Sequence, residues 1–261
     1  MSNDIDTYVI SLEEEPEILS NIKEILPNAK IFPAIDLRKE SPVGMLKKGY
    51  ITYNTCESML QKSRLRHKEI NSGGAVGIFQ STKAALSEGS GPVLLLEDDC
   101  YLEKDFTSRL RSLQERSREF DVAVFGAHIQ YASSSLKDVE GLVGWKDLTN
   151  EHALYMLNHC VYYTESGRRI ISEALKEPQE VHVDAFFSLL SMAGELRLWV
   201  QVDNQSAHQI KHVSTIGHDS LLDTCSHGKN WAIIVLLIVL TITLMIIVRT
   251  LFKTRFQNCG P

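Results

Sequence analysis

The sequence predicts an α/β layered domain with a mostly parallel central sheet, followed by one C-terminal transmembrane helix. The first part rests on short apolar runs that alternate with segments of helical hydrophobic spacing over residues 6–202. The second rests on one long, uninterrupted apolar segment at residues 231–252. The composition, 44% hydrophobic and 23% charged, is typical of a globular protein with a buried core.

The first elements alternate strand, helix and strand. Asp6–Leu12 (DTYVISL) is a short apolar run, which is typical of a buried strand. Pro16–Leu26 follows with apolar residues at helical spacing, and Ala29–Ile35 is a second apolar run. Pro33 cannot donate a hydrogen bond to a neighbouring strand, so we expect this second strand to be short or to lie at an edge of the sheet.

The same alternation continues to residue 202. The glycine-rich residues 73–77 lead into a helix at Ile78–Ser87, and the turn residues SEGSGP separate it from the next strand. Residues 128–150 are expected to be irregular. The other expected helices are Thr55–Lys68, Phe106–Arg118, Ser166–Leu175 and Asp184–Ala193, and the other expected strands are Val93–Leu96, Asp121–Phe125, Tyr155–Tyr163 and Leu196–Val202. This order favours a mostly parallel sheet.

The C-terminal segment predicts a membrane anchor. Trp231–Val248 contains only two polar residues, both threonine, and extending it to Phe252 gives roughly 33 Å of helix, enough to cross a bilayer core. We therefore expect a domain at residues 1–217, a polar linker at 218–230, a transmembrane helix at 231–252 and a short basic tail at 253–261.

The orientation of this anchor follows from two conflicting signals. The first residues lack the features of a signal peptide, which favours a tail anchor with a cytoplasmic N-terminal domain and suggests a viral or microbial source. Arg249, Lys253 and Arg255 outweigh Lys229, however, and the positive-inside rule alone would place the tail in the cytoplasm. We expect the first arrangement.

Net charge and cysteine content restrict the function classes. The formal net charge is −6, with no long basic run outside the extreme C-terminus, which argues against nucleic acid as the main partner. The five cysteines are scattered and form no CxxC pair, so we expect reduced thiols rather than a zinc site or a disulfide framework.

Three consecutive carboxylates, Glu97, Asp98 and Asp99, end the apolar run VLLLEDDC. Ligands of parallel sheets gather at the carboxyl ends of the strands, where these side chains are expected. They could simply solvate a loop or cap the next helix. They could also hold a cation, because an oxygen-only cluster suits Mg²⁺ or Mn²⁺, which share their remaining positions with phosphate. The second interpretation predicts a metal–nucleotide site.

Several blocks of the sequence resemble glycosyltransferase family 25, the lipopolysaccharide and collagen galactosyltransferase family. VLLLEDDCYLEKDF is similar to its strand with Glu-Asp-Asp, and GAVGIFQSTKAAL is similar to its glycine-containing helix start. YVISL and FPAIDL resemble its first two strands, and HALYMLNHCVYYTESGRRIISEAL, VHVDAFF and HVSTIG resemble its later blocks. The order of the blocks is preserved over residues 7–217.

The resemblance implies a GT-A-like fold, a UDP-sugar donor and a divalent metal, Mn²⁺ or Mg²⁺. It implies transfer of a hexose, galactose or glucose, to a hydroxyl on a protein, lipid or glycan. The implied metal ligands are Asp99 and Glu97. Glu97 and Asp98, together with Gly74, Gly77 and Ser81 of the glycine-containing block, are the implied donor-binding residues.

Asp184 occupies the position of the family's late acidic residue, which implies a general base for the acceptor hydroxyl. It could instead cap the helix that follows it. Two departures support a rival interpretation: the chain has LEEEPE where the family carries arginines, and Ser81-Thr82 where it carries Ser-His. The rival is a catalytically inactive, membrane-anchored binding or assembly protein.

Overall fold

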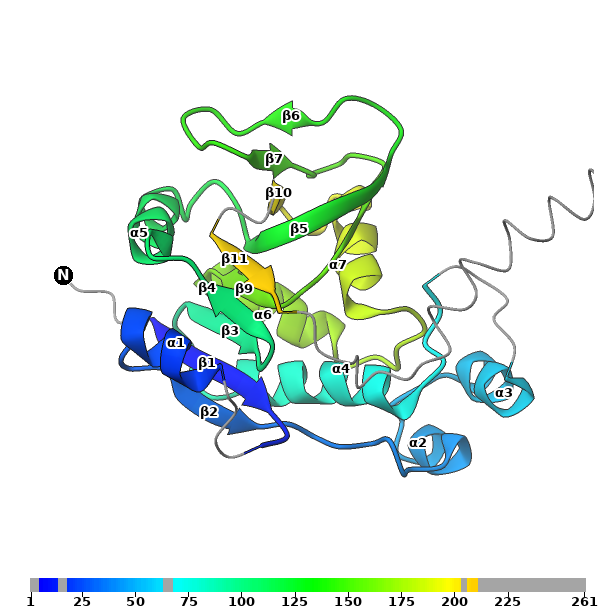
Figure 1. Cartoon of the computed structure of the whole chain (residues 1–261). Helices are drawn as coiled ribbons and strands as arrows, with labels where there is room; N and C mark the ends of the chain where they lie inside the picture. The colour runs from blue at the N-terminus through cyan, green and yellow to red at the C-terminus, as the bar shows by residue number, and fades with distance from the viewer. Residues whose placement is uncertain (1–4, 14–17, 63–67, 203–205, 211–261) are drawn as a thin grey trace, which may run out of the picture. The chain divides into compact units, whose positions relative to one another are not determined.

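The computed structural model describes residues 5–13, 18–62, 68–202 and 206–210. Within them, nine strands form one sheet in the order β2-β1-β3-β9-β5-β10-β7-β6, with β8 paired to β5 outside that path (Figure 1). Its strands are β1 (Asp6–Ser11), β2 (Lys30–Pro33), β3 (Val93–Glu97), β5 (Val122–Ala132), β6 (Lys137–Asp138), β7 (Trp145–Asp147), β8 (Ala153–Met156), β9 (Cys160–Tyr163) and β10 (Leu198–Val202). A separate ribbon pairs β4 (Cys100–Leu102) with β11 (Ala207–Gln209).

Most strands of the central sheet run in one direction. β1 pairs in parallel with both β2 and β3, and β10 pairs in parallel with β5. β9 lies antiparallel between β3 and β5, so those two strands also point the same way. The carboxyl ends of β1, β2, β3, β5 and β10 therefore lie toward one edge, which confirms the predicted α/β class with a mostly parallel sheet.

Helices cover both faces of the sheet. The side chains of a strand alternate between its two faces, and both faces of β3 are apolar. The helices are α1 (Leu19–Ile25), α2 (Pro42–Lys47), α3 (Tyr53–Gln61), α4 (Gly73–Leu86), α5 (Phe106–Glu115), α6 (Glu165–Ala174) and α7 (Val183–Met192). Val93 and Leu95 of β3 belong to the hydrophobic cluster under α4, α6 and α7, whereas Leu94 and Leu96 belong to the cluster under α1 and α5.

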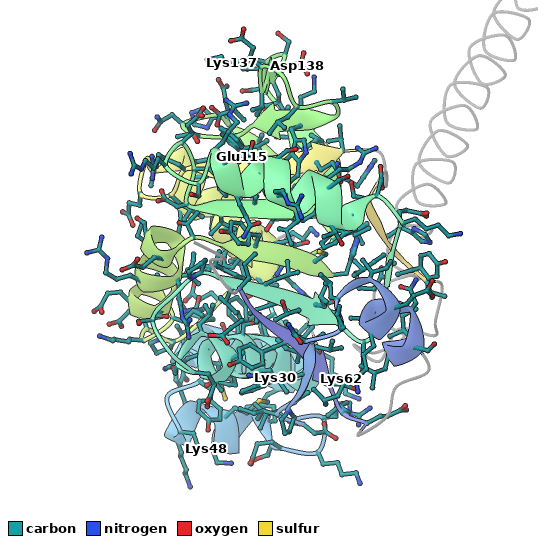
Figure 2. The ribbon with its side chains drawn as sticks, turned by 90° about the vertical axis from the view of Figure 1, so that its left-hand side faces the viewer. Lys30, Lys48, Lys62, Glu115, Lys137 and Asp138 are labelled. Carbon is teal, nitrogen blue, oxygen red and sulfur yellow. The ribbon has the colours of Figure 1, made fainter. Side chains whose placement is uncertain are left out.

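The two borders of the sheet are formed by β2 and β6. Lys137 and Asp138 of β6 mark one border, and Lys30 of β2 lies toward the other (Figure 2). The expectation that the proline-interrupted second strand is short and lies at an edge is confirmed, since β2 has four residues and pairs only with β1.

The prediction of one strand at Tyr155–Tyr163 is wrong. The structure divides this segment into β8 and β9, and Leu157, with a φ of 76°, interrupts the extended backbone between them. Both strands pair with β5, β8 along its carboxyl-terminal part and β9 along its amino-terminal part. The break matters because it places Asn158 and His159 at the carboxyl end of β3.

The prediction of an irregular segment at residues 128–150 is also wrong. β5 continues to Ala132, and β6 and β7 follow it. The last five residues of β5 are exposed or half-buried, so this part of the strand lacks the apolar run that identified its beginning.

Helix boundaries differ from the predictions where a cap decides them. α4 begins at Gly73, five residues before the predicted start, because the Ser72 hydroxyl accepts a hydrogen bond from the Ala75 N–H. α3 ends at Gln61, since Lys62 adopts the left-handed conformation that commonly ends a helix. Helix α2 was not predicted.

The C-terminal predictions lie outside the described residues. The predicted end of the domain at residue 217, the linker, the transmembrane helix at 231–252 and the basic tail all belong to residues 211–261. Of the helices in the described part, none has the length and apolar character needed to span a bilayer.

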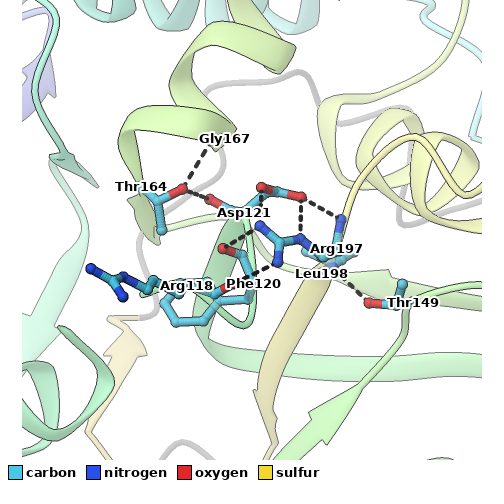
Figure 3. A network of polar contacts seen from close by, with 8 residues as sticks. All are labelled: Arg118, Phe120, Asp121, Thr149, Thr164, Gly167, Arg197 and Leu198. Atoms are coloured by element: carbon cyan, nitrogen blue, oxygen red, sulfur yellow. Dashed lines mark hydrogen bonds and ion pairs between the residues drawn. The ribbon is translucent and has the colours of Figure 1, made fainter. Parts of the chain in front are cut away.

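Helix α6 is fixed to the start of β5 by a close backbone approach (Figure 3). The carbonyl of Asp121 accepts hydrogen bonds from the Thr164 N–H and hydroxyl, at 3.0 and 3.1 Å. The Thr164 hydroxyl in turn accepts from the Gly167 N–H at 3.0 Å. A Cβ at Gly167 would lie 1.9 Å from the Asp121 carbonyl oxygen, so only glycine permits this contact.

We expect Gly167→Ala to lower the free energy of unfolding by about 3 kcal/mol, because the new methyl group must push α6 away from β5. Gly91→Ala is the matched control, since a Cβ there meets nothing within 4 Å. Urea unfolding of both variants measures the effect. Equal unfolding midpoints for the two variants would show that the close approach of Gly167 to the Asp121 carbonyl does not contribute to stability.

Candidate functional site

The carboxylates lie where β3 ends. Glu97 is the last residue of β3, and Asp98 and Asp99 form the turn into β4. The Glu97 N–H donates to the His159 carbonyl at 2.9 Å, and the Asp99 carbonyl accepts from the Ile210 N–H at 2.8 Å. The backbone of the turn is therefore held on both sides, by the segment between β8 and β9 and by the residue after β11.

Side chains from two other strands orient two of these carboxylates. The hydroxyl of Ser11, the last residue of β1, donates to Asp98 Oδ2 at 2.7 Å. The amide of Gln209, at the end of β11, donates to Asp99 Oδ2 at 2.5 Å. These two hydrogen bonds hold the carboxylates of Asp98 and Asp99 in defined orientations.

Glu97 is the carboxylate most affected by its surroundings. Burial raises its pKa to about 8, and the negative charges of Asp99, Asp98 and Asp184 act in the same direction. The effect of Asp184 shows that a residue 87 positions away in the sequence lies within electrostatic reach of the turn. A cation placed among these groups would favour ionisation of Glu97.

Asp184 lies in the first turn of α7. Its Oδ1 accepts a hydrogen bond from the Ala185 N–H at 2.8 Å, and its Oδ2 pairs with Lys68 Nζ at 2.9 Å. The N-cap residue of α7 is His182, two residues before Asp184. Asp184 is therefore not the N-cap, although it does satisfy one first-turn N–H, and its role as a base stays a prediction.

Lys68 is a site residue that sequence reasoning missed. The His182 N–H donates to the Lys68 carbonyl at 2.8 Å, and this bond fixes Lys68 beside the start of α7. The side chains of Lys68 and Asp184 are both 13% exposed, so the ion pair is largely shielded from water. No sequence pattern marks Lys68, because it follows a polar stretch and its partner lies 116 residues away.

Two tyrosines border the carboxylates, and they too were missed. Burial raises the pKa of Tyr155, as do the charges of Asp184 and Glu97, and its hydroxyl donates to Asn158 Oδ1 at 3.0 Å. Burial and the charge of Glu97 raise the pKa of Tyr163. The polar residues Asn158 and His159 interrupt the apolar run. They could have indicated that this segment forms two strands rather than one.

Gly77 and Ser81 have a packing role in the structure. A Cβ at Gly77 would lie 2.5 Å from the Ile35 carbonyl oxygen. The Ser81 hydroxyl accepts from the Ile35 N–H at 2.8 Å and donates to the Gly77 carbonyl at 2.7 Å. These contacts bind α4 to the segment after β2. Donor binding by Gly74, Gly77 and Ser81 stays a prediction.

Glu97 and Asp99 are residue types that suit a hard divalent cation, one that also coordinates a phosphate. Among the described residues, no three Asp, Glu, His or Cys side chains already form a group that could hold a metal ion. Mg²⁺ seldom uses such a cage, because it is usually bound by one or two carboxylates together with substrate phosphates. Glu97 and Asp99 offer oxygen ligands of this kind.

Comparison with known proteins identifies no family for this chain. No family model matches it, and no curated protein matches it. Among solved structures, S. aureus TarS 1–349 in complex with UDP-GlcNAc matches with 12% identity and a TM-score of 0.45 over 81% of this chain. The chain spans 60% of the length of that fragment.

Two further solved structures match at similar levels. UDP-glucose pyrophosphorylase complexed with UDP-glucose has 12% identity and a TM-score of 0.40, over 76% of this chain and 90% of that one. The 4-diphosphocytidyl-2C-methyl-D-erythritol synthase of Anaerococcus prevotii has 11% identity and a TM-score of 0.42, over 82% and 96%. We transfer no residue role from these matches.

We expect Glu97 to make stability depend on pH when no metal is present. Its folded-state pKa lies above the unfolded value of about 4.3, so the folded protein holds the proton more tightly. This contribution is fully present below the unfolded pKa and is lost as the pH rises toward 8. In EDTA, the unfolding free energy of the wild type should therefore fall over this range.

Glu97→Gln should remove this fall, because glutamine keeps the shape of the side chain and does not ionise. Urea unfolding at a series of pH values measures it, and Glu115→Gln, at an exposed position of α5, is the control. The same pH dependence in Glu97→Gln and wild type would contradict the assignment.

Proposed function

We propose that this chain is a metal-dependent glycosyltransferase of GT-A-like fold, which transfers a hexose from a UDP-sugar to a hydroxyl of a protein, lipid or glycan. The observation that carries the proposal is the run Glu97, Asp98 and Asp99 at the carboxyl end of β3, with Asp184 of α7 close enough for its charge to raise the pKa of Glu97. The UDP-sugar donor and the hexose follow from the resemblance of the sequence blocks to family 25.

Asp99 and Glu97 would hold the metal, Mn²⁺ or Mg²⁺. When bound, such an ion neutralises the donor diphosphate and stabilises the charge that develops on the departing nucleotide. Asp98, fixed by the Ser11 hydroxyl, orients the turn that carries both ligands. Lys68 pairs with Asp184 and so offsets the negative charge of that carboxylate.

Asp184 would act as the base that activates the acceptor. The acceptor oxygen forms a bond to the anomeric carbon, the bond from that carbon to the UDP oxygen breaks, and the acceptor proton passes to Asp184. Lys68 fixes Oδ2 and the Ala185 N–H fixes Oδ1, so the carboxylate is held in one orientation before the acceptor binds. A fixed base avoids the cost of reorganisation during the reaction.

The same ion pair favours one alternative. Because Lys68 already satisfies Asp184, the domain could bind a ligand at this edge without catalysis, as an inactive membrane-anchored assembly protein. In both cases we propose that residues 231–252 anchor the domain, with residues 1–217 in the cytoplasm. The activity of an Asp184 variant distinguishes the two functions.

We expect Asp184→Asn to lower sugar transfer by about 10²-fold or more, since positioned bases contribute rate factors of this size. UDP binding with Mn²⁺ should persist, because Glu97 and Asp99 remain in place. The assay is UDP release from UDP-galactose and UDP-glucose, first with a panel of hydroxyl acceptors and then with each variant.

Asp138→Asn is the matched control, because Asp138 is an exposed carboxylate of β6, at the far border of the sheet. Wild-type turnover in Asp184→Asn would refute the catalytic role of Asp184. Metal-dependent UDP binding by a wild type that transfers no sugar would instead support the inactive binding protein.

A further inference from the structure

We propose that a second site, at the opposite edge of the sheet, binds a small organic phosphate. The site is a cavity of about 790 Å³ whose lining includes four arginines, Arg118, Arg168, Arg169 and Arg197. We call it the basic cavity. Glu165 is the only acidic residue in its lining among the described residues, although the whole chain carries a net charge of −6.

The basic cavity is separate from the carboxylates. Its lining includes Pro92 just before β3, Arg197 just before β10 and Thr164 just after the antiparallel β9. All three lie at the amino-terminal edge of the parallel strands. Glu97 lies at the other end of β3, roughly 15 Å away at about 3.3 Å per strand residue.

Arg168 is a buried, positively charged residue of the cavity lining. It is only 3% exposed, its Nε donates to the Leu86 carbonyl at 2.7 Å, and its Nη1 donates to the Gly91 carbonyl at 2.8 Å. Its Nη2 is also buried and finds no hydrogen-bond partner in the part of the chain that the structure describes. Arg168 therefore places a positive charge beside the cavity that is bonded to carbonyl groups and not to a carboxylate, and this charge attracts an anion bound there.

The acidic residues around Arg168 do not pair with it. Asp6, Glu88 and Arg168 all act electrostatically on Tyr8, so they share one neighbourhood. Within the described residues, however, Arg168 forms no ion pair with either carboxylate. Arg197 differs, because Asp121 accepts hydrogen bonds from its Nε and Nη2 at 3.0 and 2.8 Å and neutralises its charge (Figure 3).

Arg118 and Arg169 are the side chains available for direct contact. Both are exposed, and neither forms a hydrogen bond or ion pair through its side chain with another described residue. They approach the cavity from different elements, Arg118 from the segment after α5 and Arg169 from α6. The N-terminus of the ten-residue α6 also belongs to the lining and adds a partial positive charge.

The size and lining of the basic cavity favour an organic phosphate over a bare anion. A volume of about 790 Å³ is within the range of small-molecule sites and exceeds what one phosphate group fills. Leu86, Pro92 and Tyr162 form the apolar part of the lining beside the organic group, whereas Arg118 and Arg169 provide the anion contacts. A soluble phosphate ester and a phospholipid headgroup share this chemistry.

Calorimetric titration of the purified full chain in EDTA tests the proposal. Glycerol 3-phosphate represents the soluble ester, dioctanoyl phosphatidic acid represents the headgroup, and glycerol is the uncharged control. The test variant is the double substitution Arg118→Gln with Arg169→Gln, which alters only exposed side chains and leaves Arg168 intact. Arg111→Gln, at an exposed position of α5 outside the lining of the cavity, is the matched control, and thermal melting verifies that all variants fold.

We expect the wild type to bind at least one phosphate probe, and the double variant to bind it about tenfold more weakly or worse. Arg111→Gln should bind as the wild type does. Binding of glycerol 3-phosphate identifies a soluble ligand, and binding of phosphatidic acid alone identifies a headgroup. Absence of binding by both probes, or equal weakening in Arg111→Gln, would overturn the proposal.

Discussion

Repulsion among like charges is the constraint on which the candidate site depends. Glu97, Asp98 and Asp99 follow one another at the end of a buried strand, and Asp184 reaches the same edge from α7. Burial and these neighbouring charges raise the pKa of Glu97 to about 8, so part of the repulsion is relieved by holding a proton. A divalent cation relieves it more completely, because it lets every carboxylate ionise. In the proposed function, binding of the metal offsets the cost of holding these charges together.

The surrounding structure keeps the carboxylates from separating. Ser11 at the end of β1 holds Asp98, and Gln209 at the end of β11 holds Asp99. The break between β8 and β9 brings the His159 carbonyl to the Glu97 N–H. On the helical side, the segment around Lys68 bonds to the residue before α7 and pairs with Asp184. Sheet topology therefore determines the electrostatics of the site, because each partner comes from a different part of the chain.

The sequence could predict what depends on local patterns. Alternating apolar runs predicted the sheet class and strands such as β3, and the EDD run marked the edge where ligands are expected. It could not predict the division of residues 155–163, which depends on the positive φ of Leu157 and on pairing of both parts with β5. Nor could it predict Lys68, whose partner lies 116 positions away, or the pairing of Arg197 with Asp121 across 76 residues. Those contacts arise only when distant segments pack together.

The measurement that tests the central claim most directly is the affinity for UDP in Mn²⁺ and in EDTA, for the wild type and Asp99→Asn. Asparagine keeps the shape of the side chain and its contact with Gln209 but removes the charge. If Asp99 holds a cation together with the nucleotide diphosphate, the wild type binds UDP much more tightly in Mn²⁺ than in EDTA, and Asp99→Asn loses most of that difference. Equal affinities for both proteins in both buffers would contradict the account.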